Sequence, residues 1–197
     1  MKWLVFLLFS ISINAQITPS YQATHFKKND VIGIPCSSSE TTMSLPNQSS
    51  TFSPNVRGYY FTAPIDFCIT GVKVPTTATS DCQNVAIVKF TSGAPLAYPT
   101  LTNNFVQLHY SSCVAGDNVI TVDISVSQGD IIGIYGCRGT SCTNSYGNNS
   151  GFSFTIGGQA VTALRSGMQY NLNTTQMKDI WYENNSNISR VEMYYKY

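Results

Sequence analysis

The sequence predicts an all-β fold: an antiparallel, jelly-roll-like β-sandwich held together by disulfide bonds. Three observations lead to it. Apolar and polar residues alternate along many short segments, turns rich in Gly, Pro and Asn separate those segments, and six cysteines are spread along the chain. Because side chains alternate across a strand, such alternation predicts one buried and one solvated face. Many short strands at close spacing are typical of sandwiches and jelly rolls.

The clearest strand is residues 120–126, ITVDISV, where β-branched apolar residues alternate with polar ones. Residues 128–130 then form a predicted turn. The same reasoning predicts further strands at residues 58–62, 67–74, 85–90, 105–110, 131–135, 152–156 and 188–197. The most helix-like window, residues 173–181, is short and rich in Thr and Asn, so no helix is expected. The Ser/Thr/Asn-rich segments 37–53 and 140–151 are expected to be surface loops.

The first residues combine the three parts of a secretory signal. A short cationic start with Lys2 precedes an apolar run at residues 4–9, and Ala15 supplies a small residue for cleavage before Gln16. The apolar run is far shorter than the roughly 20 residues that a membrane anchor needs. We therefore expect a cleaved signal peptide and a secreted, extracellular product.

The predicted organisation has three parts. The signal peptide covers residues 1–15. An N-terminal segment covers residues 16–56, with a strand at 29–35 and the Ser/Thr-rich loop. The sandwich body covers residues 57–197.

Charge is sparse, at 11% of residues, and the formal net charge is +1. A near-neutral chain without basic clusters has no electrostatic footprint for nucleic acid or for an anionic membrane. We therefore expect neither as a partner.

The cysteines predict disulfide bonds, because their number is even and the chain is expected to be exported. A zinc site is the alternative, but the sequence has no CxxC pair, and its histidines, His25 and His109, are far apart. Short spacing favours Cys137 with Cys142, and Cys68 with Cys82 would close a strand-to-strand connection. Cys36 with Cys113 is then left. The sequence alone leaves the connectivity open.

Catalytic groups are scarce. A Ser-His-Asp triad needs a base and usually a GxSxG turn, but only His25 and His109 are available and no such turn occurs. His109 is predicted to share a strand face with Phe105 and Gln107, which is more typical of a structural or solvated histidine. Glycoside hydrolysis needs paired carboxylates, whereas the only glutamates are Glu40, Glu183 and Glu192. We therefore expect no enzyme activity and no cofactor.

A structural Ca²⁺ ion is an open alternative, because Asp117, Asp123 and Asp130 are close to one predicted strand. Glycosylation is a second open possibility, if the source is eukaryotic. The Asn-x-Ser/Thr sequons are at Asn47, Asn148, Asn173, Asn184 and Asn187.

Aromatic residues are dense near predicted strand ends, and flat rings can stack on sugars or anchor an interface. Packing in the core is the alternative, and residues 191–197 alternate as a half-buried strand would. Trp181 and Tyr182 are expected to be exposed, since they precede Glu183 and a run of Asn. Tyr146 lies between turn-forming residues. These three are the candidate ligand-binding residues.

Several segments together resemble β-sandwich modules of secreted or surface-anchored bacterial proteins. They are RGYYFTAP at 57–64, FCITGVKVP at 67–75 and GDIIGIYG at 129–136, with a closing strand at 188–194. The resemblance implies a surface or adhesion module. It implies no site residues, since modules of this kind are mostly uncharacterised.

The functional expectation is a secreted, non-enzymatic binding or surface/matrix module that recognises an extracellular glycan or another matrix or surface component. The first alternative is a coat or matrix component that assembles with itself. The second is a secreted hydrolase on a jelly-roll frame.

Overall fold

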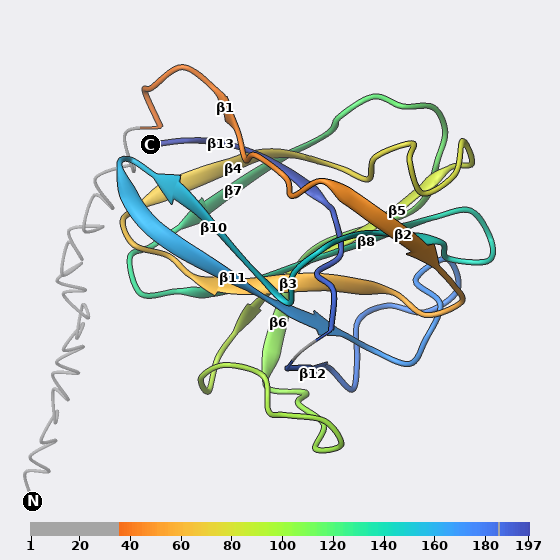
Figure 1. Ribbon diagram of the computed structural model, residues 1–197. Helices are drawn as coiled ribbons and strands as arrows, with labels where there is room; N and C mark the ends of the chain where they lie inside the picture. Colours follow the sequence, from red (N-terminus) through yellow and green to blue (C-terminus); the bar gives the residue numbers. More distant parts are fainter. Residues whose placement is uncertain (1–35, 185) are drawn as a thin grey trace, which may run out of the picture. The chain divides into compact units, whose positions relative to one another are not determined.

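Two antiparallel sheets packed together form most of the structure, a computed structural model that describes residues 36–184 and 186–197 (Figure 1). No helix occurs among these residues, and hence none long and apolar enough to cross a membrane. The predicted fold class, an antiparallel sandwich stapled by disulfides, is confirmed. The predicted signal peptide at 1–15, the strand at 29–35 and His25 lie outside the described residues.

The smaller sheet has the strand order β1 (Thr41–Thr42), β13 (Glu192–Lys196), β4 (Phe67–Lys73), β7 (Ile120–Val126). The larger sheet has the order β10 (Gly151–Ile156), β11 (Gln159–Gly167), β3 (Arg57–Thr62), β8 (Ile131–Arg138), β5 (Gln83–Phe90), β6 (Phe105–Val114), and β12 (Trp181–Tyr182) pairs with β11. A separate pair consists of β2 (Gln48–Phe52) and β9 (Asn144–Gly147). The chain changes sheet from β3 to β4 and back to β5, and again from β6 to β7 and back to β8, as in a jelly roll.

Alternate residues of facing strands build the core between the two sheets. Tyr59 and Phe61 of β3 and Phe67 and Ile69 of β4 belong to one buried cluster, and each is at most 1% exposed. The ring centroids of Phe61 and Phe67 are 6.2 Å apart. Burying a side chain of this size stabilises the fold by about 1.5–3 kcal/mol. These residues therefore hold the two sheets against each other.

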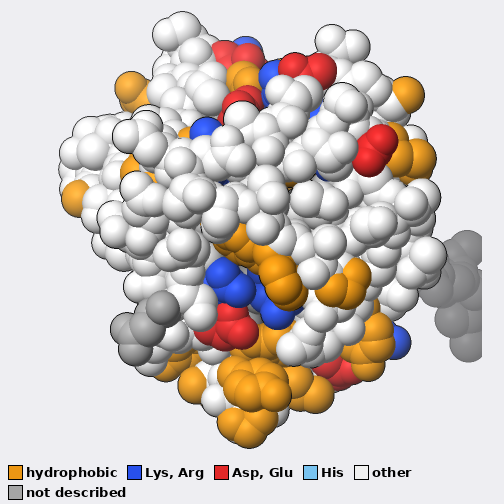
Figure 2. Space-filling view, turned by 45° about the vertical axis from the view of Figure 1, so that its right-hand side comes forward, with side chains coloured by type: hydrophobic (Ala, Val, Ile, Leu, Met, Phe, Trp, Pro, Cys, Tyr) orange, Lys and Arg blue, Asp and Glu red, His pale blue; other side chains and the backbone are white. Residues whose placement is uncertain are grey.

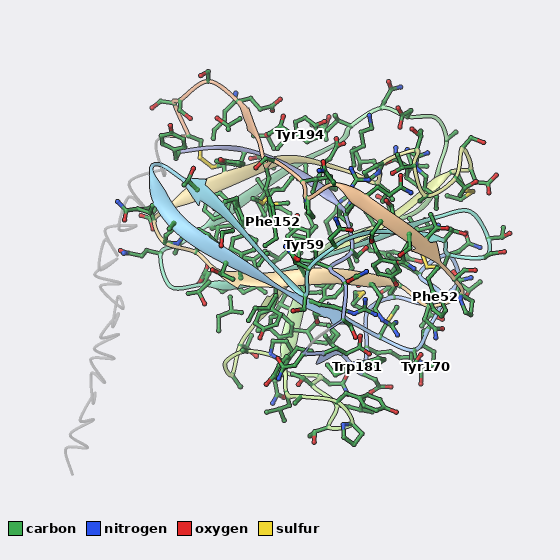
Figure 3. All side chains as sticks on the ribbon, in the orientation of Figure 1. Phe52, Tyr59, Phe152, Tyr170, Trp181 and Tyr194 are labelled. Atoms are coloured by element: carbon green, nitrogen blue, oxygen red, sulfur yellow. A yellow bond between two sulfur atoms is a disulfide. The ribbon has the colours of Figure 1, made fainter. Side chains whose placement is uncertain are left out.

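The other face of the larger sheet is covered as well. Tyr60, Val88 and Tyr135 pack in a second buried cluster with residues of the segment 168–181, among them Met168, Leu172, Ile180 and Trp181. Figure 3 shows Tyr59 in the core between the sheets and Trp181 apart from that core, at the short strand β12. Strands buried on both faces carry continuous apolar runs. The second cluster therefore explains the run Val-Ala-Ile-Val in β5.

Each of the eight strands predicted within the described residues corresponds to an observed one, although β13 covers only Glu192–Lys196 of the segment predicted at 188–197. The prediction that 37–53 and 140–151 are loops was wrong in part, because they contain β1, β2 and β9. Every residue of β2 is exposed, so this strand has no apolar pattern that sequence analysis could detect. The strands β11 and β12 were not predicted either.

Residues 36–56 belong to the same compact unit as residues 57–197. Strand β1 pairs with β13, and β2 pairs with β9, so the two segments predicted to be loops contact each other.

Three disulfides join Cys36 to Cys68, Cys82 to Cys113, and Cys137 to Cys142. The predicted Cys137–Cys142 bond is confirmed, but the predicted pairs Cys68–Cys82 and Cys36–Cys113 were wrong. Cys68 is on β4 of the smaller sheet, whereas Cys82 immediately precedes β5 of the larger one. Because β5 and β6 pair, Cys82 lies beside Cys113 of β6 instead. Three disulfides indicate an oxidising environment.

Candidate functional site

A pocket of about 520 Å³ lies at β2, β9, the start of β3 and the end of β11. Its lining residues are Ser50, Thr51, Phe52, Arg57, Tyr146, Arg165, Ser186 and Asn187. The volume is within the range of about 300–1,000 Å³ typical of small-molecule sites. Figure 2 shows basic and acidic side chains together in a hollow bordered by hydrophobic ones. We call this hollow the arginine pocket.

Arg57 enters the arginine pocket because a glycine lies opposite it on the neighbouring strand. Arg57, Gly167 and Trp181 are paired directly across β3, β11 and β12. Directly paired residues face the same side of a sheet. A Cβ at Gly167 would lie 2.4 Å from Arg57 Cδ and 2.8 Å from the backbone oxygen of Val56. The missing side chain leaves room for the Arg57 guanidinium, whose Cζ lies 5.3 Å from the Trp181 ring centroid.

Arg165 comes two residues before Gly167 on β11 and therefore lies on the same side of the strand. Its Nε donates to Glu183 Oε2 at 2.5 Å, and its Nη1 donates to the carbonyl of Asn187. Its guanidinium carbon lies 5.0 Å from the ring centroid of Tyr146. Each of the two pocket arginines thus packs on the face of an aromatic ring, a favourable cation–π arrangement.

A single carboxylate serves both arginines. Glu183 Oε2 accepts from Arg165 and is 3.8 Å from Arg57 Nε, which is beyond hydrogen-bond distance. Two guanidiniums and one carboxylate leave the arginine pocket with one excess positive charge.

Two buried polar atoms of the pocket residues have no hydrogen-bond partner among the described residues: Arg57 Nε and the Tyr146 hydroxyl. Arg57 is 5% exposed and Tyr146 is 4% exposed. The Nη1 of Arg57, by contrast, donates to the carbonyls of Val56 and Met168. A buried polar group without a partner destabilises a fold by about 1–3 kcal/mol. The pocket therefore contains donors that the described part of the fold leaves unused.

The charge states follow from burial and from the neighbouring charges. Burial lowers the pKa of the Arg57 guanidinium. Burial raises the pKa of the Tyr146 phenol, and Arg165 and Arg57 lower it less, Arg165 from a position near the hydroxyl that falls short of full hydrogen-bonding geometry, so the phenol stays protonated at neutral pH. Burial also raises the pKa of the Glu183 carboxyl, but Arg165, Trp181 and Arg57 together lower it more, so it lies below the usual value of 4.5. The Trp181 indole contributes although its Nε1 has no partner at full hydrogen-bonding geometry. Glu183 is therefore ionised at neutral pH.

A second pocket, of about 350 Å³, adjoins the arginine pocket at Ser186, which lines both. Its lining residues are Ala97, Tyr98, Tyr182, Glu183, Asn184 and Ser186. The Tyr98 side chain is 59% exposed, and its ring centroid is 5.5 Å from that of Trp181. We call this the tyrosine pocket. An exposed aromatic surface thus lies beside the charged one.

The three candidate ligand-binding residues lie around these two pockets. Tyr146 lines the arginine pocket, Tyr182 lines the tyrosine pocket, and Trp181 packs beneath Arg57. The prediction that Trp181 is exposed was wrong: it is 1% exposed, because the segment before it folds back onto the larger sheet. Tyr146 lies in strand β9 and not in a loop, and Tyr182 is half-buried. Ligand binding by these residues stays a prediction.

Sequence analysis missed both pocket arginines, although a signal for each was present. Arg57 alternates with Tyr59 and Phe61, and Arg165 alternates with Val161 and Ala163. Tyr59, Phe61, Val161 and Ala163 belong to the buried core. An arginine at a position where the alternation of a strand calls for a buried apolar residue indicates a buried charge with a specific role.

The residues considered for catalysis do not come together. His109 is on β6, where its Nε2 lies 2.8 Å from Ser111 Oγ, and no carboxylate of the described residues is hydrogen-bonded to it. Glu40 accepts from Thr70 and Glu192 accepts from Tyr194, while Glu183 lines the tyrosine pocket and accepts from Arg165 of the arginine pocket.

The aspartates considered for Ca²⁺ are not brought together, and the described residues contain no group of three or more His, Cys, Asp or Glu that could hold a metal. Asp117 precedes β7 and pairs with Arg138 and Lys73, whereas Asp130 follows β7 and pairs with Lys89. These two aspartates therefore lie at opposite ends of β7, a strand of 7 residues that rise about 3.3 Å each.

The five sequon asparagines are all at least partly exposed. Two of them are next to the candidate site: Asn187 lines the arginine pocket and Asn184 the tyrosine pocket. Nδ2 of Asn187 donates to Ser49 Oγ at 3.3 Å.

Comparison with known proteins gives no match to a protein-family model, to a curated protein or to a solved structure. The resemblance to bacterial surface modules therefore stays a prediction, and the proposals below rest on the geometry of the two pockets.

Proposed function

We propose that the chain is a secreted, non-enzymatic extracellular module that binds glycans in the adjoining arginine and tyrosine pockets. The observation that carries the proposal is the pair of unpartnered buried donors, Arg57 Nε and the Tyr146 hydroxyl, next to exposed aromatic surface. The three disulfides fit an extracellular location.

The lining of the pockets suits a sugar. A sugar ring carries several hydroxyl groups around a partly apolar face, and binding sites combine apolar or aromatic surface with a few placed polar groups. Here Ser50, Thr51, Ser186 and Asn187 offer hydroxyl and amide groups, and Tyr98 offers an exposed ring.

A glycan array followed by titration calorimetry tests the proposal. The probe variant is Tyr98→Ala, and the control is Leu101→Ala, because Leu101 is 48% exposed, belongs to the same β5–β6 connection and lines neither pocket. We expect Tyr98→Ala to weaken binding about tenfold and Leu101→Ala to leave it unchanged. Retention of no glycan, or equal behaviour of the two variants, would reject the proposal.

Self-assembly is a second candidate, favoured by a different observation. Strand β6 is an edge of the larger sheet, and Leu96, Leu101 and Val106 of β6 and the adjoining β5–β6 connection are each about half exposed. Exposed apolar edge strands can pair with another chain. Self-assembly predicts a mass in sedimentation that rises with concentration and returns to the monomer in Val106→Lys. A monomer at all concentrations would rule it out.

A further inference from the structure

The charge of the arginine pocket points to the class of ligand. Arg57 and Arg165 contribute two positive charges and Glu183 one negative charge, so a ligand with one negative charge would neutralise the pocket. A phosphate monoester, with nearly two negative charges at neutral pH, would overcompensate.

The unused donors point to an oxygen anion. The Tyr146 hydroxyl has no partner at full hydrogen-bonding geometry, and the Arg165 guanidinium packs on the ring of the same tyrosine. Arg57 Nε is a second unpartnered donor on the same side of the sheet. Arginine and hydroxyl donors form their strongest hydrogen bonds with carboxylates and similar anions.

We propose that the arginine pocket binds the carboxylate of an acidic sugar residue, such as a uronic acid within an oligosaccharide. This inference rests on the proposed glycan-binding function. Arg57, Arg165 and Tyr146 hold the carboxylate, while the hydroxyl and amide groups of Ser50, Thr51 and Asn187 face the sugar hydroxyls. A neutral oligosaccharide would leave the excess positive charge and the buried donors unmatched, and its binding is correspondingly weaker.

The decisive experiment uses a matched pair of ligands: a tetrasaccharide containing glucuronic acid, and the same tetrasaccharide after chemical reduction of its carboxyl groups to alcohols. Calorimetry with the full mature chain measures both affinities. We expect the acidic form to bind about a hundredfold more tightly, because one fully desolvated charge pair distinguishes the two.

Three variants locate the effect. Tyr146→Phe removes only the hydroxyl and should weaken binding of the acidic form about tenfold and binding of the reduced form by less, so that the preference for the acid falls. Arg165→Gln should remove the preference for the acid, and Arg165→Lys should restore part of it. Since Arg165 also holds Glu183, thermal unfolding of each variant is measured in parallel. Tyr146→Phe keeps the test valid if Arg165→Gln does not fold.

The outcomes separate this inference from the proposed function. Equal binding of the acidic and reduced forms overturns the inference but leaves glycan binding intact. Binding of neither form overturns the inference, and it overturns the proposed function as well if no glycan on the array is retained. Preference for the acid that is unchanged in Tyr146→Phe and in Arg165→Gln places the anion elsewhere and also overturns the inference.

Discussion

Two arginines of this chain are buried to a similar degree but differ in how many of their nitrogens have hydrogen-bond partners. Arg138 has no exposed surface, and its nitrogens donate to the carbonyls of Val74, Asp81 and Gly116 and to the Asp117 carboxylate. Arg57 is 5% exposed, and its Nε has no hydrogen-bond partner among the described residues, although Glu183 Oε2 is 3.8 Å away. The comparison shows that burial of an arginine alone does not identify a binding site. What distinguishes Arg57 is a hydrogen-bond donor without a partner beside a pocket.

The surroundings of Arg138 are also cross-linked. Arg138 follows Cys137, which is bonded to Cys142, and its acceptor Asp81 precedes Cys82, which is bonded to Cys113. Arg138 therefore serves the fold, and its removal should affect stability more than removal of Arg57.

The largest effect is expected for Arg138→Met. The substitution leaves the carbonyls of Val74, Asp81 and Gly116 without this donor, and each unmatched buried acceptor costs about 1–3 kcal/mol, so we expect the free energy of unfolding to fall by about 3–5 kcal/mol. Urea denaturation under non-reducing conditions measures it. A loss below about 1 kcal/mol would show that the matched arginine is dispensable, which contradicts the comparison.

Arg57→Met is expected to have a smaller effect, a loss of about 1–2 kcal/mol of unfolding free energy. The substitution removes the hydrogen bonds to Val56 and Met168, but a methionine can keep the contact with the Trp181 ring. The same urea experiment, run beside Arg138→Met, makes the comparison. Equal losses of unfolding free energy in the two variants would contradict the inferred difference between the two arginines.

The Glu183 carboxyl predicts a pH dependence of the arginine pocket. Because its pKa is lowered in the folded state, its contribution to stability is present above its usual value of 4.5 and is lost as the pH falls through the folded value. We expect Glu183→Gln to be less stable than the wild type at pH 7, by no more than about 1 kcal/mol. Towards pH 3 this difference should shrink, as urea denaturation at both pH values would show. The same difference at both pH values would mean that the carboxyl does not titrate as inferred.

The smallest effects come from two matched tyrosine variants. The buried Tyr59 hydroxyl donates to the carbonyl of Val191 at 2.8 Å, whereas the Tyr146 hydroxyl has no partner. Tyr59→Phe should therefore lower the unfolding free energy by about 1–2 kcal/mol, and Tyr146→Phe should change it by less than about 0.5 kcal/mol or increase it. Differential scanning calorimetry compares the two. A loss for Tyr146→Phe as large as that for Tyr59→Phe would indicate a partner for its hydroxyl.

The part of the fold that sequence analysis predicted is the part with strong alternation. Residues 120–126 became β7 with the predicted bounds, and its apolar residues face the core. The pair β2 and β9 was missed because its polar residues give no signal about which face is buried. Its pairing joins residues about a hundred positions apart, which local patterns do not specify.

The candidate site was predicted only in part, for a related reason. Tyr146, Trp181 and Tyr182 were singled out as aromatic residues, and they lie around the two pockets. The arginines that define the charge were not, because their juxtaposition depends on the register of β3 against β11 and on the absence of a side chain at Gly167.

The Cys36–Cys68 bond has a mechanical consequence. Cys68 is paired with Lys196 at the end of β13, and β1 pairs with β13 on its other side, so a pull between Cys36 and Tyr197 acts on the sulfur bridge and on the β4–β13 and β1–β13 pairs. Both strands would be loaded from the same end, and their hydrogen bonds would open one after another, like a zipper. The larger sheet, which carries Arg57 and Arg165, stays outside this load path. Tension between Cys36 and Tyr197 is therefore taken up first by the smaller sheet and not by the strands that carry the arginines.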